Sequence, residues 1–171
     1  YVHASRFDEA ITLYEQVLTD STRILGEDHP NTLSFRNDLA GAYREAGRLD
    51  EAIQLFEQTF RDRIRVLGED HPDTLTSRNN LAGAYREAGR LDEAIQLFEQ
   101  TFRDRIRVLG EDHPDTLTSR NNLACAYHAA DRLTEAITQY EQVLTDTIRI
   151  LGEDHPDTLT SRNNLACAYH A

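Results

Sequence analysis

Apolar side chains recur along this chain at intervals of three and four residues, in two stretches separated by a short polar interruption. In the first stretch, residues 72–88, they are Leu75, Leu81, Ala82, Tyr85 and Ala88. In the second stretch, residues 92–109, they are Ala94, Ile95, Phe98, Phe102, Ile106 and Leu109. This spacing keeps apolar groups on one face of an α-helix. The pattern therefore predicts two amphipathic helices, neither of which buries its apolar face without neighbours.

Glycine and proline indicate where these helices begin and end. Gly68 follows the apolar end of a helix, where glycine adopts a positive φ at no steric cost. His71 precedes Pro72 and is disfavoured in the helical region, whereas Pro72 suits the first turn of a new helix. Asp73 then lies near the positive end of that helix dipole. A tight turn at Gly89 joins the two helices into a hairpin.

The whole pattern repeats along the chain. The string Gly-Glu-Asp-His-Pro begins every 42 residues, at Gly26, Gly68, Gly110 and Gly152. Residues 43–84 and 85–126 are identical except that Cys125 stands where the earlier copy has Gly83. Near-identity at this level indicates either recent duplication or deliberate construction. The chain is therefore expected to be a repeat array, in which each hairpin contacts mainly its neighbours.

Composition and charge narrow the class of protein. Hydrophobic residues make up 39% of the 171 residues and charged ones 28%, which argues against disorder. The net charge of −12 disfavours the phosphate backbone of a nucleic acid as a partner. No apolar run approaches the 18 residues that a membrane span needs, so no membrane association is expected. The two cysteines occupy equivalent repeat positions and form no disulfide framework, which favours a reducing, cytoplasmic location.

Two short motifs carry a resemblance to a known family. The first is Leu81-Ala82-x-x-Tyr85 in the first helix, and the second is Ala94-x-x-x-Phe98 in the second helix. Both are similar to the spacing of the tetratricopeptide repeat, in which small residues let the two helices approach closely. The motifs recur in register, so the resemblance extends over the whole chain.

Two departures indicate the class within that family. Arg78 stands where the first helix of the repeat usually has a tryptophan. The proline that normally ends a unit of 34 residues comes about eight residues later, at Pro114, which lengthens the second helix by about two turns. A unit of 42 residues with these features resembles the kinesin-light-chain class of tetratricopeptide repeats. Similar units occur in many bacterial proteins, often behind a nucleotide-binding switch module.

The resemblance implies an all-α fold, a right-handed α-solenoid of antiparallel helical hairpins (the tetratricopeptide superhelix). Residues 1–171 are expected to form a single solenoid of about four 42-residue units. The implied function is a protein–protein interaction module that binds a peptide or partner segment in its concave groove. The alternatives are a structural repeat element that assembles with itself and the sensor arm of a larger bacterial switch protein.

Alignment of the repeats predicts that the chain is cut within a hairpin at both ends. Tyr1 aligns with Tyr43 inside a first helix, and residues 6–25 would form a second helix without its partner. Residues 156–171 would form a first helix with no second helix after it. We therefore expect a fragment of a longer array. The two unpartnered helices are complementary, which predicts head-to-tail self-association through residues 6–25 and 156–171.

According to the resemblance, the first helix of each hairpin lines the groove, and ligands lie there as extended peptides or short helices. The groove positions singled out here are Asn37, Asn79, Asn80, Asn121, Asn122, Asn163, Asn164, Arg44, Arg86 and His128. Asparagine amides offer donors and an acceptor to an extended backbone. Arg44 and Arg86 add positive charge, which favours an acidic or phosphorylated segment as partner.

A structural interpretation of the asparagines remains beside the binding one. Asparagines on neighbouring helices can hydrogen-bond one another and so hold the register of the repeats. Family members that clamp a carboxyl-terminal carboxylate carry a lysine where this chain has Asn37 and Asn79, and an asparagine where it has Gly41 and Gly83. Both departures argue against that kind of carboxylate recognition.

The sequence disfavours metal binding and catalysis. Cys125 with His128, and Cys167 with His170, offer soft ligands for zinc, but a small thiol packed beside a tyrosine is the commoner arrangement. The cluster of acidic residues and histidine around His71 recurs in every inter-repeat loop, where capping and turn chemistry account for it. Catalysis needs one unique constellation. The sequence therefore predicts no enzyme activity, no cofactor and no metal.

Overall fold

The computed structural model describes the backbone of residues 2–170 and the side chains of residues 6–170. The sequence-based placements of Tyr1 and Ala171 lie outside these described residues. Within them the chain forms helices and no strand. The helices are α1 (Val2–Leu25), α2 (Pro30–Glu45), α3 (Leu49–Leu67), α4 (Pro72–Glu87), α5 (Leu91–Leu109), α6 (Pro114–Ala129), α7 (Leu133–Leu151) and α8 (Pro156–His170).

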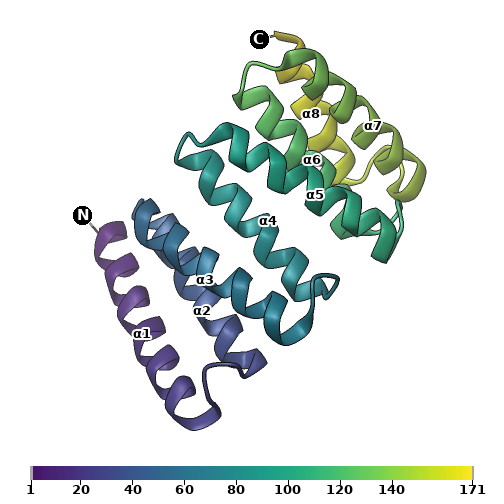
Figure 1. Ribbon diagram of the computed structural model, residues 1–171. Coiled ribbons are helices and arrows are strands. Elements are labelled where there is room, and N and C mark those ends of the chain that lie inside the picture. The colour runs from purple at the N-terminus through teal and green to yellow at the C-terminus, as the bar shows by residue number, and fades with distance from the viewer. Residues whose placement is uncertain (1, 171) are drawn as a thin grey trace. The chain divides into compact units, whose positions relative to one another are not determined.

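The helices form two compact units, residues 1–88 and 89–171. In the first unit α1 packs on α2, α2 on α3 and α3 on α4, and α2 also contacts α4. In the second unit α5 packs on α6, α6 on α7 and α7 on α8. Within each unit successive helices run antiparallel, as Figure 1 shows. These findings confirm the all-α solenoid of helical hairpins.

Each first helix begins with a histidine cap that the sequence did not predict as such. His71 is the N-cap of α4, with an extended backbone (φ −66°, ψ 136°), and its Nδ1 accepts a hydrogen bond of 3.1 Å from the backbone N–H of Asp73. His29, His113 and His155 make the same bond at the starts of α2, α6 and α8. The bond satisfies one of the orphan donors of the first turn. The Asp-His-Pro string is therefore a helix start, as expected, with histidine as the acceptor.

The turn between the helices of a hairpin needs a positive φ. Gly47 supplies it with φ 75°, and Asp131, which holds the same repeat position, reaches φ 59°. Ser5 occupies this position at the beginning of the chain, where no turn forms and α1 is continuous from Val2 to Leu25. The expected helix over residues 6–25 is therefore longer than predicted. A serine does not favour the positive φ that ends the helix in the other repeats.

Small residues bring the helices of a hairpin close together. Ala40 and Ala52, from α2 and α3, are completely buried. Phe56 packs beside them and is 1% exposed, and its repeat equivalent Phe98 is buried to the same extent. Deep burial of aromatic rings contributes much of the core stability. Over the described residues, no helix is both long and apolar enough to cross a bilayer.

Candidate binding groove

The predicted groove residues all lie on the first helices of the hairpins. In the first unit Asn37 and Arg44 come from α2, and Asn79, Asn80 and Arg86 come from α4. In the second unit Asn121, Asn122 and His128 come from α6, and Asn163 and Asn164 come from α8. Asn163 is exposed and the others are half-buried. Half-burial leaves these side chains both packed against a neighbour and accessible to a ligand.

The asparagines pair across neighbouring helices within each unit. Asn80 Nδ2 donates to Asn37 Oδ1 at 3.2 Å, between α4 and α2. Asn164 Nδ2 donates to Asn121 Oδ1 at 3.0 Å, between α8 and α6. Each bond uses only part of what an amide offers, because a side-chain amide has two donor hydrogens and an acceptor oxygen with two lone pairs. The pairs therefore hold register while keeping polar capacity for a ligand.

A cavity of about 520 Å³ lies beside the asparagine pair of the first unit. Phe7 and Tyr14 of α1 form part of its wall, and Asn37, Arg44 and Asn80 complete it from α2 and α4. Its volume falls in the range of about 300–1,000 Å³ that is usual for ligand sites. The cavity joins aromatic surface to amide and guanidinium groups, which suits a peptide with both apolar and polar side chains.

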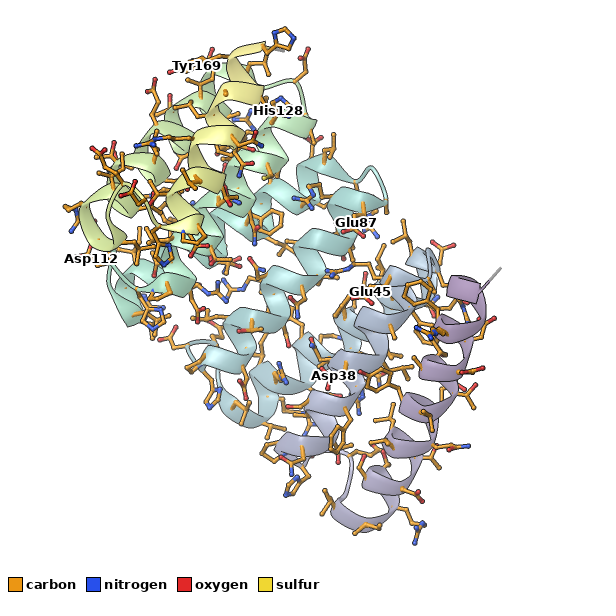
Figure 2. The ribbon with its side chains drawn as sticks, turned by 180° about the vertical axis from the view of Figure 1, so that it is seen from behind. Asp38, Glu45, Glu87, Asp112, His128 and Tyr169 are labelled. Carbon is orange, nitrogen blue, oxygen red and sulfur yellow. The ribbon has the colours of Figure 1, made fainter. Side chains whose placement is uncertain are left out.

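The charges around this cavity have both signs. Arg6 and Arg44 line it together with Asp38 and Glu45. The acidic side chains Asp38 and Glu45 on α2 and Glu87 on α4 are labelled in Figure 2. Arg44 reaches toward α4, where its Nε lies 3.8 Å from Glu87 Oε2. Arg44 is therefore partly neutralised by the protein itself.

The glycines of the groove leave space that a Cβ could occupy without a clash. A Cβ added to Gly83 would lie 3.5 Å from Arg44 Nη1, whereas one added to Gly41 would meet nothing within 4 Å. Cys125 holds the equivalent position in the second unit, where the hydroxyl of Tyr140 lies 3.1 Å from its sulfur. This contact matches the packing of a thiol beside a tyrosine. Both cysteines are free thiols, and no group of three or more possible metal ligands occurs in the part of the chain that is described.

Buried arginines are the polar residues that the sequence analysis missed. Arg36 in α2 forms an ion pair of 2.5 Å with Asp62 in α3, and Arg120 in α6 pairs with Asp146 in α7. Arg78, at the usual tryptophan position, is 2% exposed and lies 5.6 Å from the ring centre of Phe60. An arginine can replace the tryptophan because its planar guanidinium stacks on an aromatic ring.

Tyrosine and glutamate form a second polar column. The Tyr43 hydroxyl donates to Glu15 at 2.7 Å, and Tyr127 donates to Glu99 at 2.7 Å. Burial and this hydrogen bond raise the pKa of Tyr127 to about 12. The Glu99 carboxylate therefore ties α5 to α6. The sequence signal for this contact was the constant separation of 28 residues between the tyrosine and the glutamate.

Comparison with known proteins identifies sequences and structures that are similar to this chain. Three overlapping matches to the family model described as Tetratricopeptide repeat cover residues 1–63, 35–105 and 89–148. A solved structure of nearly identical TPR-like repeats from Podosopora anserina, named for kinesin light chain, shares 35% identity. The similarity covers 99% of this chain and 81% of that chain, with a TM-score of 0.84. A variant of the same protein gives a TM-score of 0.86, at the same identity, over 99% and 80% of the two chains.

More distant structures share the fold. BtubC (BKLC) from P. vanneervenii is 22% identical, with a TM-score of 0.81 over 96% of this chain and 66% of that chain. Bacillus thuringiensis PlcR, solved with the peptide PapR7 and DNA, is 16% identical, with a TM-score of 0.64 over 98% and 70%. None of the curated proteins compared matches the chain.

The family matches run from residue 1 to residue 148, which is most of the chain. They agree with the 42-residue period and with the close helix packing at Ala40 and Ala52. The chain belongs to the tetratricopeptide repeat family, and its repeats are of the kinesin-light-chain-like class.

Proposed function

We propose that this chain is a protein-interaction module that binds a peptide or partner segment along its first helices and catalyses no reaction. Tetratricopeptide repeats generally mediate protein–protein interaction. The observation that carries the proposal is the half-buried polar column beside a cavity in the first unit, where Asn37, Asn80 and Arg44 meet aromatic surface. Convergent polar groups at the edge of an apolar cavity are typical of a binding site.

Peptide binding by a related fold supports the proposal by analogy only. PlcR was solved in complex with the peptide PapR7. Its 16% identity limits that comparison to the fold. The preference for an acidic segment stays a prediction. Arg44 already lies near Glu87, and the cavity carries charges of both signs, so the charges alone do not select an acidic ligand. A cytoplasmic location also stays a prediction, consistent with the free thiols Cys125 and Cys167.

Replacing groove asparagines tests the proposal. A peptide selected for binding to the intact chain is expected to lose at least tenfold in affinity for the Asn37→Ala and Asn79→Ala variants. The physical reason is that each truncation removes side-chain amide donors and an acceptor that would otherwise bind the backbone of the ligand. Isothermal titration calorimetry with each variant measures the change in Kd, and thermal unfolding of the same samples measures stability.

Two comparisons separate ligand contact from register-keeping. Arg61→Ala, on the second helix α3 and largely exposed, is expected to bind the peptide as the unmodified chain does. Loss of melting temperature with unchanged peptide affinity in Asn37→Ala would contradict the binding role. That outcome would assign the Asn37–Asn80 hydrogen bond to repeat register alone.

Self-association is a second candidate, favoured by exposed apolar side chains at two helices. Leu13, Tyr14 and Val17 of α1 are exposed, and so are Leu159 and Tyr169 of α8. Burying these side chains in a head-to-tail contact would remove apolar surface from water. We expect the mass of the 171-residue chain, measured by light scattering, to rise with concentration. A constant monomer mass up to about 1 mM would rule this contact out, because association with a Kd above about 1 mM is weaker than ordinary specific binding.

A further inference from the structure

One buried repeat position changes from arginine to threonine along the chain. Arg63 in α3 and Arg105 in α5 are separated by the 42-residue period, and the next residue in the series is Thr147 in α7. All three side chains are at least 95% buried. The substitution removes a long cationic side chain from the interior of the second unit.

The arginine fills a slot between two first helices. Arg63 Nη1 donates to the backbone carbonyl of Asp73 at 2.8 Å and to Ser77 Oγ at 2.9 Å, both in α4. Its Nη2 donates to Ser34 Oγ of α2 at 3.1 Å. Arg105 repeats the first two bonds with Asp115 and Ser119, each at 2.8 Å. The slot is therefore built to hold a guanidinium through neutral acceptors.

The electrostatic surroundings of this slot act on the guanidinium in two opposite directions. Burial lowers the pKa of Arg63, while the charges of Asp73 and Asp38 act in the opposite direction. The pKa of Arg105 is lowered by burial in the same way, opposed by Asp115. An arginine stays charged under any physiological condition, so the slot holds a positive charge in both copies.

A cavity of about 420 Å³ lies where Thr147 replaces the arginine. Asp157, Ser161 and Thr118, the repeat equivalents of the acceptor residues Asp73, Ser77 and Ser34, line it. Ser161 Oγ donates to the carbonyl of Asp157 at 2.9 Å, the carbonyl that receives a guanidinium in the earlier repeats. The Thr147 hydroxyl turns away and donates to Leu144 of its own helix at 3.1 Å. The acceptor atoms remain, no arginine donates to them, and the Asp157 carbonyl receives the Ser161 hydroxyl instead.

The lining of the cavity combines apolar side chains with polar acceptors. Buried Leu117 and Val143 form apolar walls, and the exposed side chains of Ile150 and Leu151 lie at its rim. An arginine carries an apolar stem and a planar fork of donors, so it can cover such walls and reach the acceptors at once.

The charged residues on the cavity also favour a cation. Asp112 and Asp157 line it, and its lining contains no arginine or lysine. The Asp112 side chain, in the loop before α6, is labelled in Figure 2 and pairs with Arg149. Asp157 is exposed and lies 3.8 Å from His155 Nδ1. The cavity lining therefore includes two carboxylates, Asp112 and Asp157.

We propose that this cavity, bounded by α6, α7 and α8, binds the guanidinium of an arginine side chain from a partner peptide. The guanidinium donates to the Asp157 carbonyl and the Ser161 and Thr118 hydroxyls, as Arg63 does in the first unit. This proposal rests on the proposed function, which supplies the peptide, and it specifies one side chain of that peptide. A lysine ammonium brings the same charge without the planar fork.

Binding of a small arginine probe tests the site without any peptide. N-acetyl-arginine amide is expected to give saturable chemical-shift changes at the backbone amides of Thr118, Asp157 and Ser161 in two-dimensional NMR spectra. N-acetyl-citrulline amide has nearly the same shape but no charge, and its affinity is expected to be at least tenfold lower. Equal affinity for the two probes, or shifts that do not saturate, would overturn the proposal.

The chain offers a matched variant, because Thr147→Arg restores the residue of the two preceding repeats, Arg63 and Arg105. This variant is expected to fill the slot with its own guanidinium and lower probe affinity at least tenfold. Thr147→Leu fills the same space with an apolar group and is expected to lower probe affinity likewise, which keeps the test decisive if one variant does not fold. Unchanged probe affinity in the folded variant would overturn the proposal.

Failure of this site and failure of the groove are distinguishable. The arginine probe reports only on the second unit. Asn37→Ala and Asn79→Ala report on the first unit, where Thr147 makes no contribution. Peptide binding that depends on Asn37 while the arginine probe fails to bind would leave the groove standing and remove the arginine site.

Discussion

Replacing Asp146 by alanine is expected to lower the free energy of unfolding by about 3–5 kcal/mol. Asp146 in α7 and its partner Arg120 in α6 are both 8% exposed, and their side chains form an ion pair. Asp146 also accepts from Gln142 at 3.3 Å. The truncation leaves the Arg120 guanidinium buried without its counter-charge, and an uncompensated buried charge is strongly destabilising. Urea unfolding followed by circular dichroism measures the change.

Two further variants test that explanation. Asp112→Ala removes the exposed partner of Arg149 and is expected to change stability far less, because solvent screens exposed pairs. Replacing both members of the buried pair, Arg120→Met with Asp146→Leu, is expected to recover most of the loss. A double variant as unstable as Asp146→Ala would show that the pair contributes more than the avoidance of a lone buried charge.

Truncating Phe56 is the second change with a large expected effect. Phe56→Ala is expected to cost about 3–5 kcal/mol, because the ring is 1% exposed and its removal leaves a cavity between close-packed helices. The loss combines apolar surface that is no longer buried with the contacts that its neighbours no longer make. Equilibrium urea unfolding of the variant, extrapolated to water, gives the change in free energy.

The repeat supplies a matched control for this prediction. Tyr14 holds the same repeat position as Phe56 in α1 but is 37% exposed. Tyr14→Ala is therefore expected to cost much less than Phe56→Ala, although both remove an aromatic ring. Equal losses at the two positions would mean that the position in the repeat, and not burial, sets the contribution to stability.

The fold was largely predictable because the signals for it are local. Apolar spacing, Pro72 after His71 and the 42-residue period together predicted the hairpins and their boundaries to within about a residue. Only α1 differed, since Ser5 stands where a positive φ would end the helix. Local conformation follows from the residues themselves, so these features needed no tertiary information.

The helices that carry the candidate groove residues were predictable, but the contacts of those residues were not. Alignment placed Asn37 and Asn80 on first helices, and the structure brings them within 3.2 Å across 43 residues of sequence. Whether Arg44 is available to a ligand depends on Glu87, which lies on another helix. Pairing between side chains on separate helices depends on how the helices pack, which single residues do not reveal.

By itself, the sequence determined the repeat, the helices, the family resemblance and the placement of the asparagines on first helices. The sequence also contains the change from Arg63 and Arg105 to Thr147, but it does not reveal what this change does to the packing. Only the tertiary structure decided that Arg63 fills a slot between two first helices and that a cavity with the equivalent acceptors lies at Thr147. The physical reason is that a side chain's partners are set by the packing of helices distant in sequence, whereas helix formation is set by near neighbours.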